Sequence, residues 1–403
     1  MTFGALLAPA SAPASNEAAS HTPIRVLHFF KCAMPDTLGG VERVLDQIGR
    51  GAPSRGLEVD VLSLSRIPDP RVVIMDGYSV HRERIDFEFA STPISLRALR
   101  RFSQLSKWAD VIHYHFPWPF MDVAHFAARI NKPSVVTYHS DIIRQESLAR
   151  VYRPLMNRFL GSVSRIVATS PNYLSTSAIL ERFRSKVTVI PIGLDRSTYA
   201  SPSEGIMRAW RERLGAKFFL FVGVLRYYKG LHILLEAARG LDYPLVIIGS
   251  GPGERELRMK ASELGLRNIH FLGFVPDEDK IAILKLAHGV VFPSHLRSEA
   301  FGITLLEGAM FGKPLISSEI GTGTSFINID GQTGLVIPPS DPIALRDAMR
   351  WLWENDAEGA RMGRRAEERY RRLFTADQMN DRYLTLYREL VGRGAGGFSN
   401  DAS

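Results

Sequence analysis

The sequence predicts an α/β protein with two doubly wound, Rossmann-like domains in series. Short apolar runs of strand length alternate with segments of helical periodicity along most of the chain. This alternation is typical of parallel sheets that are covered by helices on both faces. The chain has 403 residues, which is too long for one ordinary core and suits two domains of common size.

The first half opens with an apolar strand at 24–30, a loop that ends at Gly39-Gly40, and a helical pattern from Val41 onward. Further strands are expected at 57–64, 111–114, 134–138, 166–169 and 187–190. Helical segments lie between several of these runs. We therefore expect one mainly parallel sheet in this half.

The second half repeats the pattern. Strands are expected at 218–222, 245–248, 269–272, 289–292 and 314–317, and helices at 231–238, 254–264, 277–287 and 304–310. The ligand loops of such sheets lie at the carboxyl ends of the strands. Two sheets in series are therefore expected to face one cleft, with the active site between the domains.

Changes in composition suggest the domain boundaries. Strand signals stop after Asp195, and the following residues are polar and interrupted by Pro and Gly. We expect a disordered leader at 1–23, an N-terminal domain at 24–195, a linker at 196–215, a C-terminal domain at 216–375, a helix at 376–391 that docks on the first domain, and a disordered tail at 392–403.

Composition excludes several classes of protein. No apolar run approaches the roughly 18 residues that a membrane-spanning helix needs. Cys32 is the only cysteine, so no intramolecular disulfide can form. The leader is a poor signal peptide because it lacks a basic start and its apolar patch is interrupted by proline. A cytoplasmic location is therefore expected.

The net charge of +8 comes mainly from the first half. Residues 24–195 hold 23 Lys and Arg against 16 Asp and Glu, and the rest of the chain is nearly balanced. The excess fits either a solvated surface or attraction to anionic lipid, nucleic acid or phosphorylated substrates. The amphipathic segment 95–108 fits either a core-facing helix or contact with anionic headgroups. The second reading would place the protein peripherally on the inner face of the cytoplasmic membrane.

Two carboxylates in the second half flank a turn that leads into an apolar helix. Glu299 precedes Phe301-Gly302, and the helix is expected to begin near Ile303. The free N–H groups of its first turn suit a sugar or a phosphate. Glu307, one turn into the helix, can accept hydrogen bonds from ribose hydroxyls. The alternative is a helix cap and a solvated helix face.

The loop after the first strand of this half carries two cations, Arg226 and Lys229. A diphosphate leaving group needs such positive charge, although both residues also fit an ordinary loop. A second loop holds Gly249, Gly251 and Gly253, whose bare backbone can approach a base or ribose closely.

In the first half, several residues at strand or helix ends are candidates for the other side of the cleft. Gly39-Gly40 fits a phosphate or hydroxyl contact and fits a plain turn equally well. His139 ends an apolar strand, where it can hold sugar hydroxyls or remain a core histidine. His113 and His115 have metal-like spacing without an acidic or cysteine partner, and we interpret them as lining the cleft.

The acidic triplet Asp277-Glu278-Asp279 resembles a metal-binding motif. It follows Pro276 and begins a helical run, where acidic residues act as caps and as partners of the helix dipole. We therefore expect no metal site and no cofactor.

Taken together, these motifs resemble a retaining glycosyltransferase of family 4, with the two-domain GT-B fold. The motifs are Gly39-Gly40, His139, the run 191–195, the loop from Arg226 to Lys229, the loop 249–253, and Glu299 with Glu307. The resemblance spans residues 24–391. Within the family, Gly-Val-Leu-Arg-Tyr-Tyr-Lys-Gly-Leu and Phe-Pro-Ser-His-Leu-Arg-Ser-Glu-Ala-Phe-Gly are similar to bacterial rhamnosyl- and mannosyltransferases of O-antigen synthesis.

The resemblance implies metal-independent transfer of D-rhamnose or mannose, with retention, from GDP-rhamnose or GDP-mannose to a polyprenyl-diphosphate-linked saccharide acceptor. It implies that the N-terminal domain binds the acceptor and the C-terminal domain binds the nucleotide sugar. The implied catalytic residues are Glu299, Lys229, Arg226 and His139. The implied donor contacts are Glu307, Phe301, Gly302, Ile303, Thr304, Gly249, Gly251, Gly253 and Phe274. The implied acceptor or cleft residues are Gly39, Gly40, His113, His115, Trp118, Asp141 and Arg144.

Two positions depart from the family pattern. Many members have an Arg directly after the strand glycine, where this chain has Val224, so Arg226 would supply that charge from a shifted position. The segment 321–331 lacks the Pro-Glu pair that many relatives have there.

Two other functional classes remain as alternatives. The same pocket would suit a nucleotide-sugar epimerase or hydrolase. A non-catalytic basic protein that binds membranes or nucleic acid is the second alternative. The sequence has no recognised nucleic-acid-binding module, so no nucleic-acid partner is expected.

Overall fold

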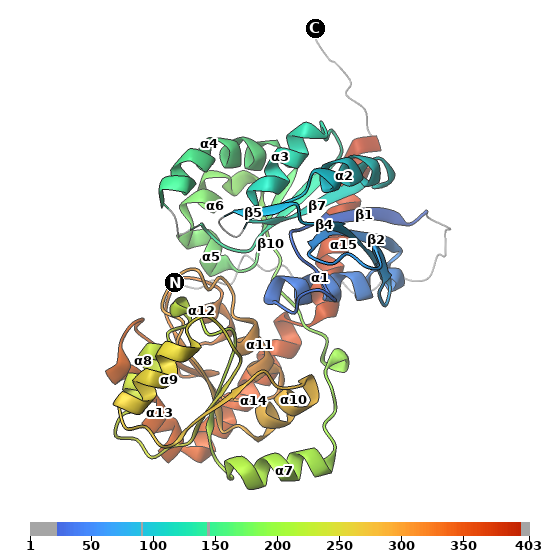
Figure 1. The fold of residues 1–403 in the computed structure, drawn as a ribbon. Coiled ribbons are helices and arrows are strands. Elements are labelled where there is room, and N and C mark those ends of the chain that lie inside the picture. The colour runs from blue at the N-terminus through green and yellow to red at the C-terminus, as the bar shows by residue number, and fades with distance from the viewer. Residues whose placement is uncertain (1–21, 90–91, 143–145, 396–403) are drawn as a thin grey trace.

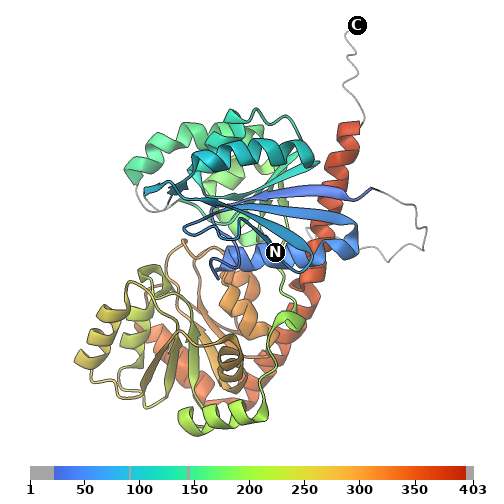
Figure 2. The same cartoon turned by 45° about the vertical axis from the view of Figure 1, so that its right-hand side comes forward.

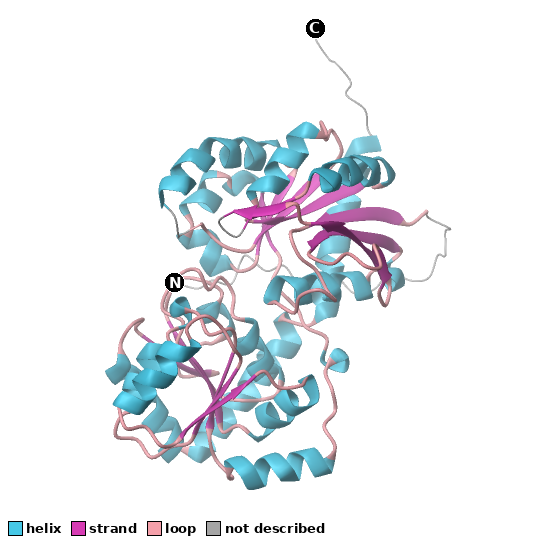
Figure 3. Ribbon diagram, viewed as in Figure 1, coloured by secondary structure: helices cyan, strands magenta, loops and turns pink. Residues whose placement is uncertain are grey.

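The computed structural model describes residues 22–89, 92–142 and 146–395, so the expected leader up to residue 21 and the tail from residue 396 lie outside the description. Two lobes lie one above the other, and the long C-terminal helix reaches from the lower lobe to the upper one (Figure 1). In each lobe, helices flank a central sheet (Figure 3). The predicted pair of doubly wound α/β domains is confirmed.

The N-terminal sheet has a reversal of strand order at its centre. Its strands, in spatial order, are β10 (Val187–Val189), β9 (Arg165–Ala168), β8 (Ser134–Tyr138), β7 (Val111–Phe116), β1 (Ile24–Phe29), β2 (Leu57–Ser65), β4 (Tyr78–Arg84) and β3 (Val72–Ile74). All neighbouring pairs are parallel except β3 and β4. The order reverses between β1 and β7, so the carboxyl ends of these two strands border the ligand crevice.

Helices cover both faces of this sheet. They are α1 (Gly40–Gly51), α2 (Leu96–Trp108), α3 (Pro119–Ala127), α4 (Glu146–Ser162), α5 (Pro171–Thr176) and α6 (Ala178–Arg182), and a hairpin of β5 (Phe87–Phe89) and β6 (Thr92–Ile94) projects beside them. Helix α2 begins where the Ser95 hydroxyl accepts a hydrogen bond from the Ala98 amide at 3.2 Å. It buries Ala98, Phe102 and Leu105, so its apolar face belongs to the core.

The C-terminal sheet has the same type of reversal. Its parallel strands, in spatial order, are β13 (Ile269–Gly273), β12 (Leu245–Ile248), β11 (Phe219–Val222), β14 (Gly289–Phe292), β15 (Leu315–Ser318) and β16 (Gly334–Ile337). Its helices are α7 (Glu204–Leu214), α8 (Leu231–Ala238), α9 (Glu254–Glu263), α10 (Asp277–Leu286), α11 (Ile303–Met310), α12 (Thr324–Ile327), α13 (Pro342–Glu354) and α14 (Asp356–Leu373). The loops after β11 and β14 meet at the switch point.

The structure adds five strands that the sequence pattern did not indicate, namely β3, β4, β5, β6 and β16. Strand β4 was hidden by its charged residues. Arg82 is buried there because its guanidinium pairs with Asp36 and donates to the carbonyl oxygens of Ile67 and Pro70. A satisfied buried cation therefore occupies a strand position that the sequence made look exposed.

The expected linker 196–215 is mostly helical. Helix α7 lies within it and packs on α10, where Trp210 Nε1 donates to Asp279 Oδ1 at 2.6 Å. The linker prediction is corrected accordingly, because residues 204–214 belong to the second domain. The Ser203 hydroxyl accepts a hydrogen bond from the Ile206 amide at 3.3 Å and sets the start of this helix.

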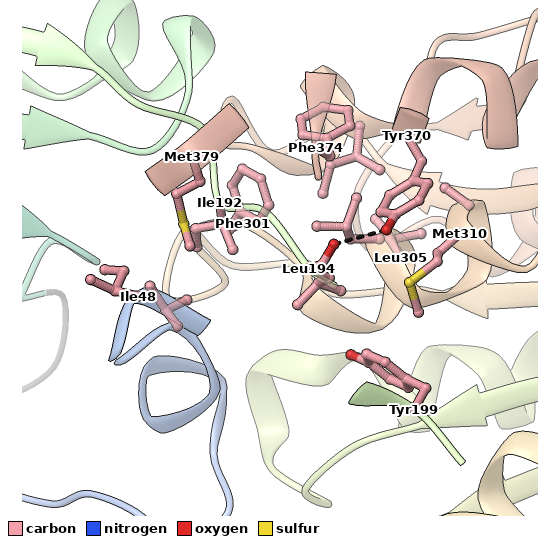
Figure 4. Close-up of a cluster of buried hydrophobic side chains, with 14 of the residues drawn as sticks. Ile48, Ile192, Leu194, Tyr199, Phe301, Leu305, Met310, Tyr370, Phe374 and Met379 are labelled. Atoms are coloured by element: carbon pink, nitrogen blue, oxygen red, sulfur yellow. Dashed lines mark hydrogen bonds between the residues drawn. The ribbon is translucent and has the colours of Figure 1, made fainter. Parts of the chain in front are cut away.

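The two domains are joined by two passages of chain that lie side by side. The Leu194 amide donates to the Phe374 carbonyl at 2.9 Å, and the Ala376 amide donates to the Leu194 carbonyl at 3.0 Å. Figure 4 shows the apolar cluster around this crossing, where the Tyr370 hydroxyl donates to the Leu194 carbonyl at 2.8 Å. A Cβ atom at Gly193 would overlap the Thr375 carbonyl, so only glycine fits there.

The long helix α15 (Ala376–Ala395) follows the second passage and lies against the N-terminal domain. It runs beside α1 in both cartoon views (Figures 1 and 2). Met379, Tyr383 and Tyr387 are buried in this contact, and Arg55 pairs with two acids of the helix. The helix extends to Ala395, so the expected disordered tail is corrected at its first four residues.

Candidate active site between the two domains

A cavity of about 510 Å³ lies between the carboxyl edges of the two sheets. The N-terminal domain contributes Gly39, Gly40, Glu42, Arg43 and His139, and the C-terminal domain contributes Lys229, Lys280, Glu299, Thr304 and Glu307. The strand-order reversals of both sheets open toward this space, which explains why residues from distant parts of the chain meet there.

Two helices begin at this cavity without a side-chain cap. Helix α11 starts after Gly302, which has a φ of 97°, and helix α1 starts after Gly39. The amides of their first turns therefore keep free N–H groups at the positive ends of the helix dipoles. Phe301, Gly302 and Ile303 line the cavity together with the Gly39-Gly40 turn, so anionic groups of a ligand have donors from both domains.

Glu299 and Lys229 form an ion pair at the cavity wall, and the Ser294 hydroxyl donates to the same Glu299 oxygen at 3.4 Å. Lys229 ends a 3₁₀ turn, Tyr227–Lys229, and Gly230 follows it with a φ of 72°. A Cβ at Gly230 would overlap the Pro293 carbonyl, so this glycine lets the Lys229 loop pack against the loop that carries Glu299.

Glu307 lies deeper and is buried. Its Oε1 accepts hydrogen bonds from the Tyr199 hydroxyl at 3.1 Å and from Lys280 Nζ at 3.4 Å. Burial and the nearby Glu307 carboxylate hold the pKa of Tyr199 well above its usual range, so the phenol stays a donor. Glu307 therefore does not lie on a solvated helix face, although α11, the helix that carries it, begins at the cavity.

The N-terminal wall contains a carboxylate that the sequence reading missed. Glu42 folds beneath the Gly39-Gly40 turn and accepts hydrogen bonds from the Thr37 hydroxyl at 2.8 Å and Cys32 Sγ at 3.2 Å. A Cβ at Gly39 would overlap this carboxylate. Burial, with a further effect of Glu42, raises the pKa of Cys32 to about 12, so the thiol remains protonated. The sequence signal that could have identified Glu42 is an acidic residue two positions after the Gly39-Gly40 helix start.

His139 is the cavity end of a chain of buried histidines. His28 Nδ1 lies 2.9 Å from His115 Nε2, and His115 Nδ1 lies 2.9 Å from His139 Nε2. Burial lowers the pKa of His28 and of His139 to about 3, so both rings are neutral at physiological pH. Each neutral ring carries one N–H. Since each ring is hydrogen-bonded to the next, all the rings must donate in the same direction along the chain.

The unpartnered end of this chain sets that direction. His28 Nε2 is buried and has no hydrogen-bond partner among the described residues. A buried N–H without an acceptor is the rarer case in proteins, so this nitrogen is assigned as unprotonated. Each ring then carries its proton on Nδ1, and His139 offers an Nδ1–H donor at the cavity.

His113 and His115 do not line the cavity, which corrects their assignment to the cleft. Strand β7 extends to Phe116, so both residues lie inside the strand and are fully buried. His113 is hydrogen-bonded to Tyr387 at 2.6 Å and to Thr137 at 2.7 Å. The covering tyrosine comes from α15, far along the chain, and periodicity within the strand could not reveal it.

Trp118 is also corrected, because it is buried in the N-terminal core and donates through Nε1 to the Pro93 carbonyl at 3.0 Å. Asp141 lies at the domain interface beside the cavity. It accepts hydrogen bonds from Tyr138 and Ser177 and pairs with Arg297 of the other domain at 3.3 Å. Arg144 lies outside the described residues.

Several residues assigned to the donor lie outside the cavity lining. The glycine loop packs instead on its neighbour, since a Cβ at Gly249 would overlap the Gly223 carbonyl and one at Gly251 would lie 2.6 Å from the Leu225 amide nitrogen. Gly253 is packed against the Leu225 carbonyl in the same way. Phe274 is 78% exposed, and Arg226 lines an adjacent hollow beside Lys31 and Cys32.

One group of described residues has the spacing of a metal site, His28 with His113 and His115, whose ligand atoms lie within 4.8 Å of one another. The chemistry does not fit a metal. Every ring nitrogen except His28 Nε2 already has a hydrogen-bond partner, and two of the would-be ligands bond to each other. Asp277, Glu278 and Asp279 surround the start of α10, where they accept from or pair with neighbouring groups.

Sequence comparisons place both halves of the chain in known families. Residues 203–369 match the family model "Glycosyl transferases group 1", and residues 38–198 match "Glycosyltransferase Family 4". The chain is 60% identical over 353 residues to D-rhamnosyltransferase WbpZ of Pseudomonas aeruginosa. This alignment covers 88% of this chain and 93% of that protein. It is 50% identical over 368 residues to O-antigen chain mannosyltransferase C of Escherichia coli, covering 91% and 99% of the two chains.

Solved structures show the same fold at low sequence identity. A sucrose-phosphate synthase from Thermosynechococcus elongatus superposes with a TM-score of 0.78 at 22% identity, over 92% of this chain and all of that one. Anabaena HepE in complex with UDP and glucose superposes with a TM-score of 0.72 at 21% identity, over 90% and 99%. With the two Rossmann-like domains and their shared cavity, these matches lead to one conclusion: the chain belongs to the family 4 glycosyltransferases and has the GT-B fold.

Proposed function

We propose that this protein transfers D-rhamnose or mannose from a GDP-sugar to a lipid-linked saccharide acceptor during O-antigen synthesis, with retained anomeric configuration. The observation that carries the proposal is the meeting of Lys229, Glu299 and the free N-terminus of α11 in one interdomain cavity. Strong sequence similarity to a D-rhamnosyltransferase and to an O-antigen mannosyltransferase supports the sugar and the pathway class.

The proposed chemistry assigns separate tasks to these groups. Lys229 and the α11 amides stabilise the negative charge of the departing diphosphate, which is electrostatic stabilisation of the transition state. Glu299 contacts the donor sugar and Glu307 the ribose. His139 donates its Nδ1–H to a sugar oxygen. Arg226 is assigned to the donor diphosphate by its charge and by family resemblance, and here it lines the neighbouring hollow.

In the reaction, the bond between the anomeric carbon and the diphosphate oxygen breaks. A new bond forms from this carbon to the acceptor hydroxyl oxygen on the same face, and the hydroxyl proton passes to the leaving phosphate oxygen. GDP is then released. The Lys229 ammonium has three N–H donors, so it can contact the donor diphosphate while it stays paired with Glu299.

The acceptor is proposed to be carried on a polyprenyl diphosphate, with the protein at the cytoplasmic face of the membrane. Among the described residues, no helix combines the length and the apolar character that crossing a bilayer requires. We propose that the protein reaches a lipid-linked acceptor peripherally. The basic excess of the first half supports this arrangement.

The test is a donor panel with and without acceptor. Purified protein is incubated with GDP-rhamnose, GDP-mannose and UDP-glucose, each in the presence and absence of a polyprenyl-diphosphate-linked saccharide. The proposal expects sugar transfer from a GDP-sugar only when acceptor is present. Donor consumption that is independent of acceptor would identify a hydrolase, and exclusive use of UDP-glucose would overturn the donor assignment.

A further inference from the structure

Two further hollows follow the active cavity along the N-terminal domain. The cavity shares Lys31 and Cys32 with a second hollow of about 570 Å³. That hollow shares Arg66 and Ile67 with a third one of about 370 Å³. The three hollows are therefore neighbours in a row, and we call the third one the arginine hollow.

The arginine hollow carries a strong excess of positive charge. It is lined by four arginines and one acid: Arg66, Arg71, Arg84, Arg97 and Glu83. Arg66 pairs with the partly exposed Glu88 at 2.7 Å. For the guanidinium groups of the other three arginines, the structure shows no hydrogen bond or ion pair to any residue within 22–89, 92–142 and 146–395. Nearby Arg82 differs, because Asp36 neutralises it.

The start of α2 contributes one arginine to this charge. Arg97 is the second residue of the helix, whose own first turn contains no acid, and the Asp86 carboxylate accepts a hydrogen bond from the Leu96 amide at 2.7 Å. A cation at this end opposes the helix dipole and is ordinarily unfavourable. An anion bound in the hollow would offset that penalty, because it would interact favourably with Arg97 and the other arginines.

Exposed apolar side chains lie next to these arginines. Ile67 lines the hollow itself and is 74% exposed, and Leu96, which precedes Arg97, is 69% exposed. Phe87 and Phe89, on either side of Glu88 in β5, are 56% and 64% exposed. Arginines beside exposed aliphatic and aromatic groups suit a ligand that joins an anionic group to a hydrocarbon chain.

From these observations we infer that the arginine hollow binds the diphosphate of the polyprenyl-linked acceptor. The lipid lies on the adjacent apolar side chains, and the saccharide extends through the second hollow to the active cavity. This assignment rests on the proposed function and names the part of the acceptor that the first domain recognises. A concave site that is separated from the active cavity by one intervening hollow favours a substrate diphosphate over the headgroups of a flat bilayer.

The central experiment compares two acceptors with the same saccharide, one on polyprenyl diphosphate and one as an uncharged octyl glycoside, both in neutral detergent. The test variant is Arg71→Gln/Arg84→Gln/Arg97→Gln. The control variant, Arg208→Gln/Arg255→Gln/Arg364→Gln, removes the same charge from exposed positions of the second domain. Circular dichroism verifies that both variants are folded.

We expect the test variant to raise KM for the diphosphate acceptor by about tenfold or more, as the loss of charge-assisted contacts to phosphate predicts. KM for the octyl glycoside and for the donor stay within about twofold, as do all values of the control variant. An unchanged KM for the diphosphate acceptor, or an equal rise for both acceptors, would overturn the assignment.

A membrane contact gives a different result. Sedimentation with vesicles of phosphatidylglycerol and of phosphatidylcholine measures binding to anionic and neutral lipid. The test variant could lose binding to the anionic vesicles while its KM for the diphosphate acceptor in detergent stays at the wild-type value. In that case the arginine hollow would be a membrane surface, and the inference would fail.

Direct binding separates failure of this inference from failure of the proposed function. With the donor site saturated by GDP, inorganic pyrophosphate is titrated into the wild-type protein and the test variant by calorimetry. Binding to the wild type that weakens about tenfold or more in the variant supports the hollow even if the enzyme transfers no sugar. Equal binding to both proteins rejects the hollow even if transfer is observed.

Discussion

Lys229 and Glu299 bring opposite charges into contact at the wall of the interdomain cavity. The ion pair keeps the lysine from being an isolated, partly buried charge in the absence of donor. It also positions the carboxylate, since Ser294 and Lys229 share the same oxygen. The two residues therefore form one unit, and a change in either alters the other.

We expect Lys229→Ala to lower kcat at saturating donor by about 10² to 10³, because one source of charge stabilisation in the transition state is lost. The matched control is Lys260→Ala, which breaks the surface pair with Glu236. Steady-state kinetics with a GDP-sugar and acceptor measure both. Near wild-type turnover in Lys229→Ala would contradict the role given to this lysine.

The buried histidines predict a pH dependence of stability. His28 has a folded-state pKa of about 3, lowered by burial, whereas an unfolded histidine titrates near 6.5. The unfolded chain therefore takes up the proton first. The stability that the neutral ring contributes is complete above about pH 6.5 and is lost as the pH falls toward 3, by up to about 1.4 kcal/mol per pH unit.

Replacing His28 with Asn should flatten the fall in the free energy of unfolding between pH 6.5 and pH 5 by an amount approaching that slope. Urea denaturation at several pH values measures it. Val26→Ala is a suitable control, because it empties a fully buried apolar site on the same strand without removing a titrating group. If both variants kept the wild-type slope, the neutral state of His28 would be wrong.

At the scale of elements, the carboxyl ends of strands were the informative positions. The sequence placed Lys229 after one strand, and Glu299 and Glu307 after another, and the structure brings all three to one cavity. The prediction succeeded where the strand pattern was plainly apolar. It missed β4 because the charges of Arg82 and its neighbours hide a buried strand, and it misplaced His113 because the covering helix α15 lies far along the chain.

The start of helix α11 depends on Gly302, the residue that precedes it. Gly302 has a φ of 97°, and a Cβ there would lie 3.3 Å from Leu305 Cδ1 and 3.4 Å from Phe292 Cε1. We expect Gly302→Ala to destabilise the protein by about 1–2 kcal/mol, the usual penalty for a side chain in the left-handed region. We also expect kcat to fall at least about tenfold, because the amides that face the cavity are displaced.

Gly265→Ala separates these two effects. Gly265 also has a positive φ, of 66°, but a Cβ there meets nothing within 4 Å, and the residue lies outside the cavity lining. Gly265→Ala should lower the free energy of unfolding, measured by urea denaturation, by an amount similar to that of Gly302→Ala, and it should leave kcat unchanged. Equal turnover of the two variants would show that the α11 terminus does not act on the substrate.

At the scale of the whole molecule, the crossing of the chain between the domains is a point of tight packing. Gly193 lies directly against the Thr375 carbonyl, beside the cluster that contains Leu194, Phe374 and Met379 (Figure 4). Both passages must separate to admit a side chain. The sequence indicated a boundary after Asp195 and a returning helix, but not that the two segments bond to each other, since that contact joins residues far apart in the chain.

Gly193→Ala is therefore expected to lower the free energy of unfolding by about 1–3 kcal/mol, the usual range for overpacking. Activity should fall as well, because the change alters the relative placement of the two walls of the cavity. Gly161→Ala is the control, since a Cβ there meets nothing within 4 Å. Thermal unfolding and kcat measure both variants, and wild-type behaviour of Gly193→Ala would argue against a tight crossing.

The paired passages also govern how the two walls can move. A single connecting segment would let one lobe rotate freely about the other. Two segments held together by hydrogen bonds at Leu194, with α15 packed along the first lobe, restrict twisting of one lobe against the other. Gly40 of the first lobe and Ile303 of the second face each other at close range, since a Cβ at Gly40 would lie 3.3 Å from Ile303 Cγ1. A twist between the lobes would misalign these two helix starts, and the paired passages oppose it.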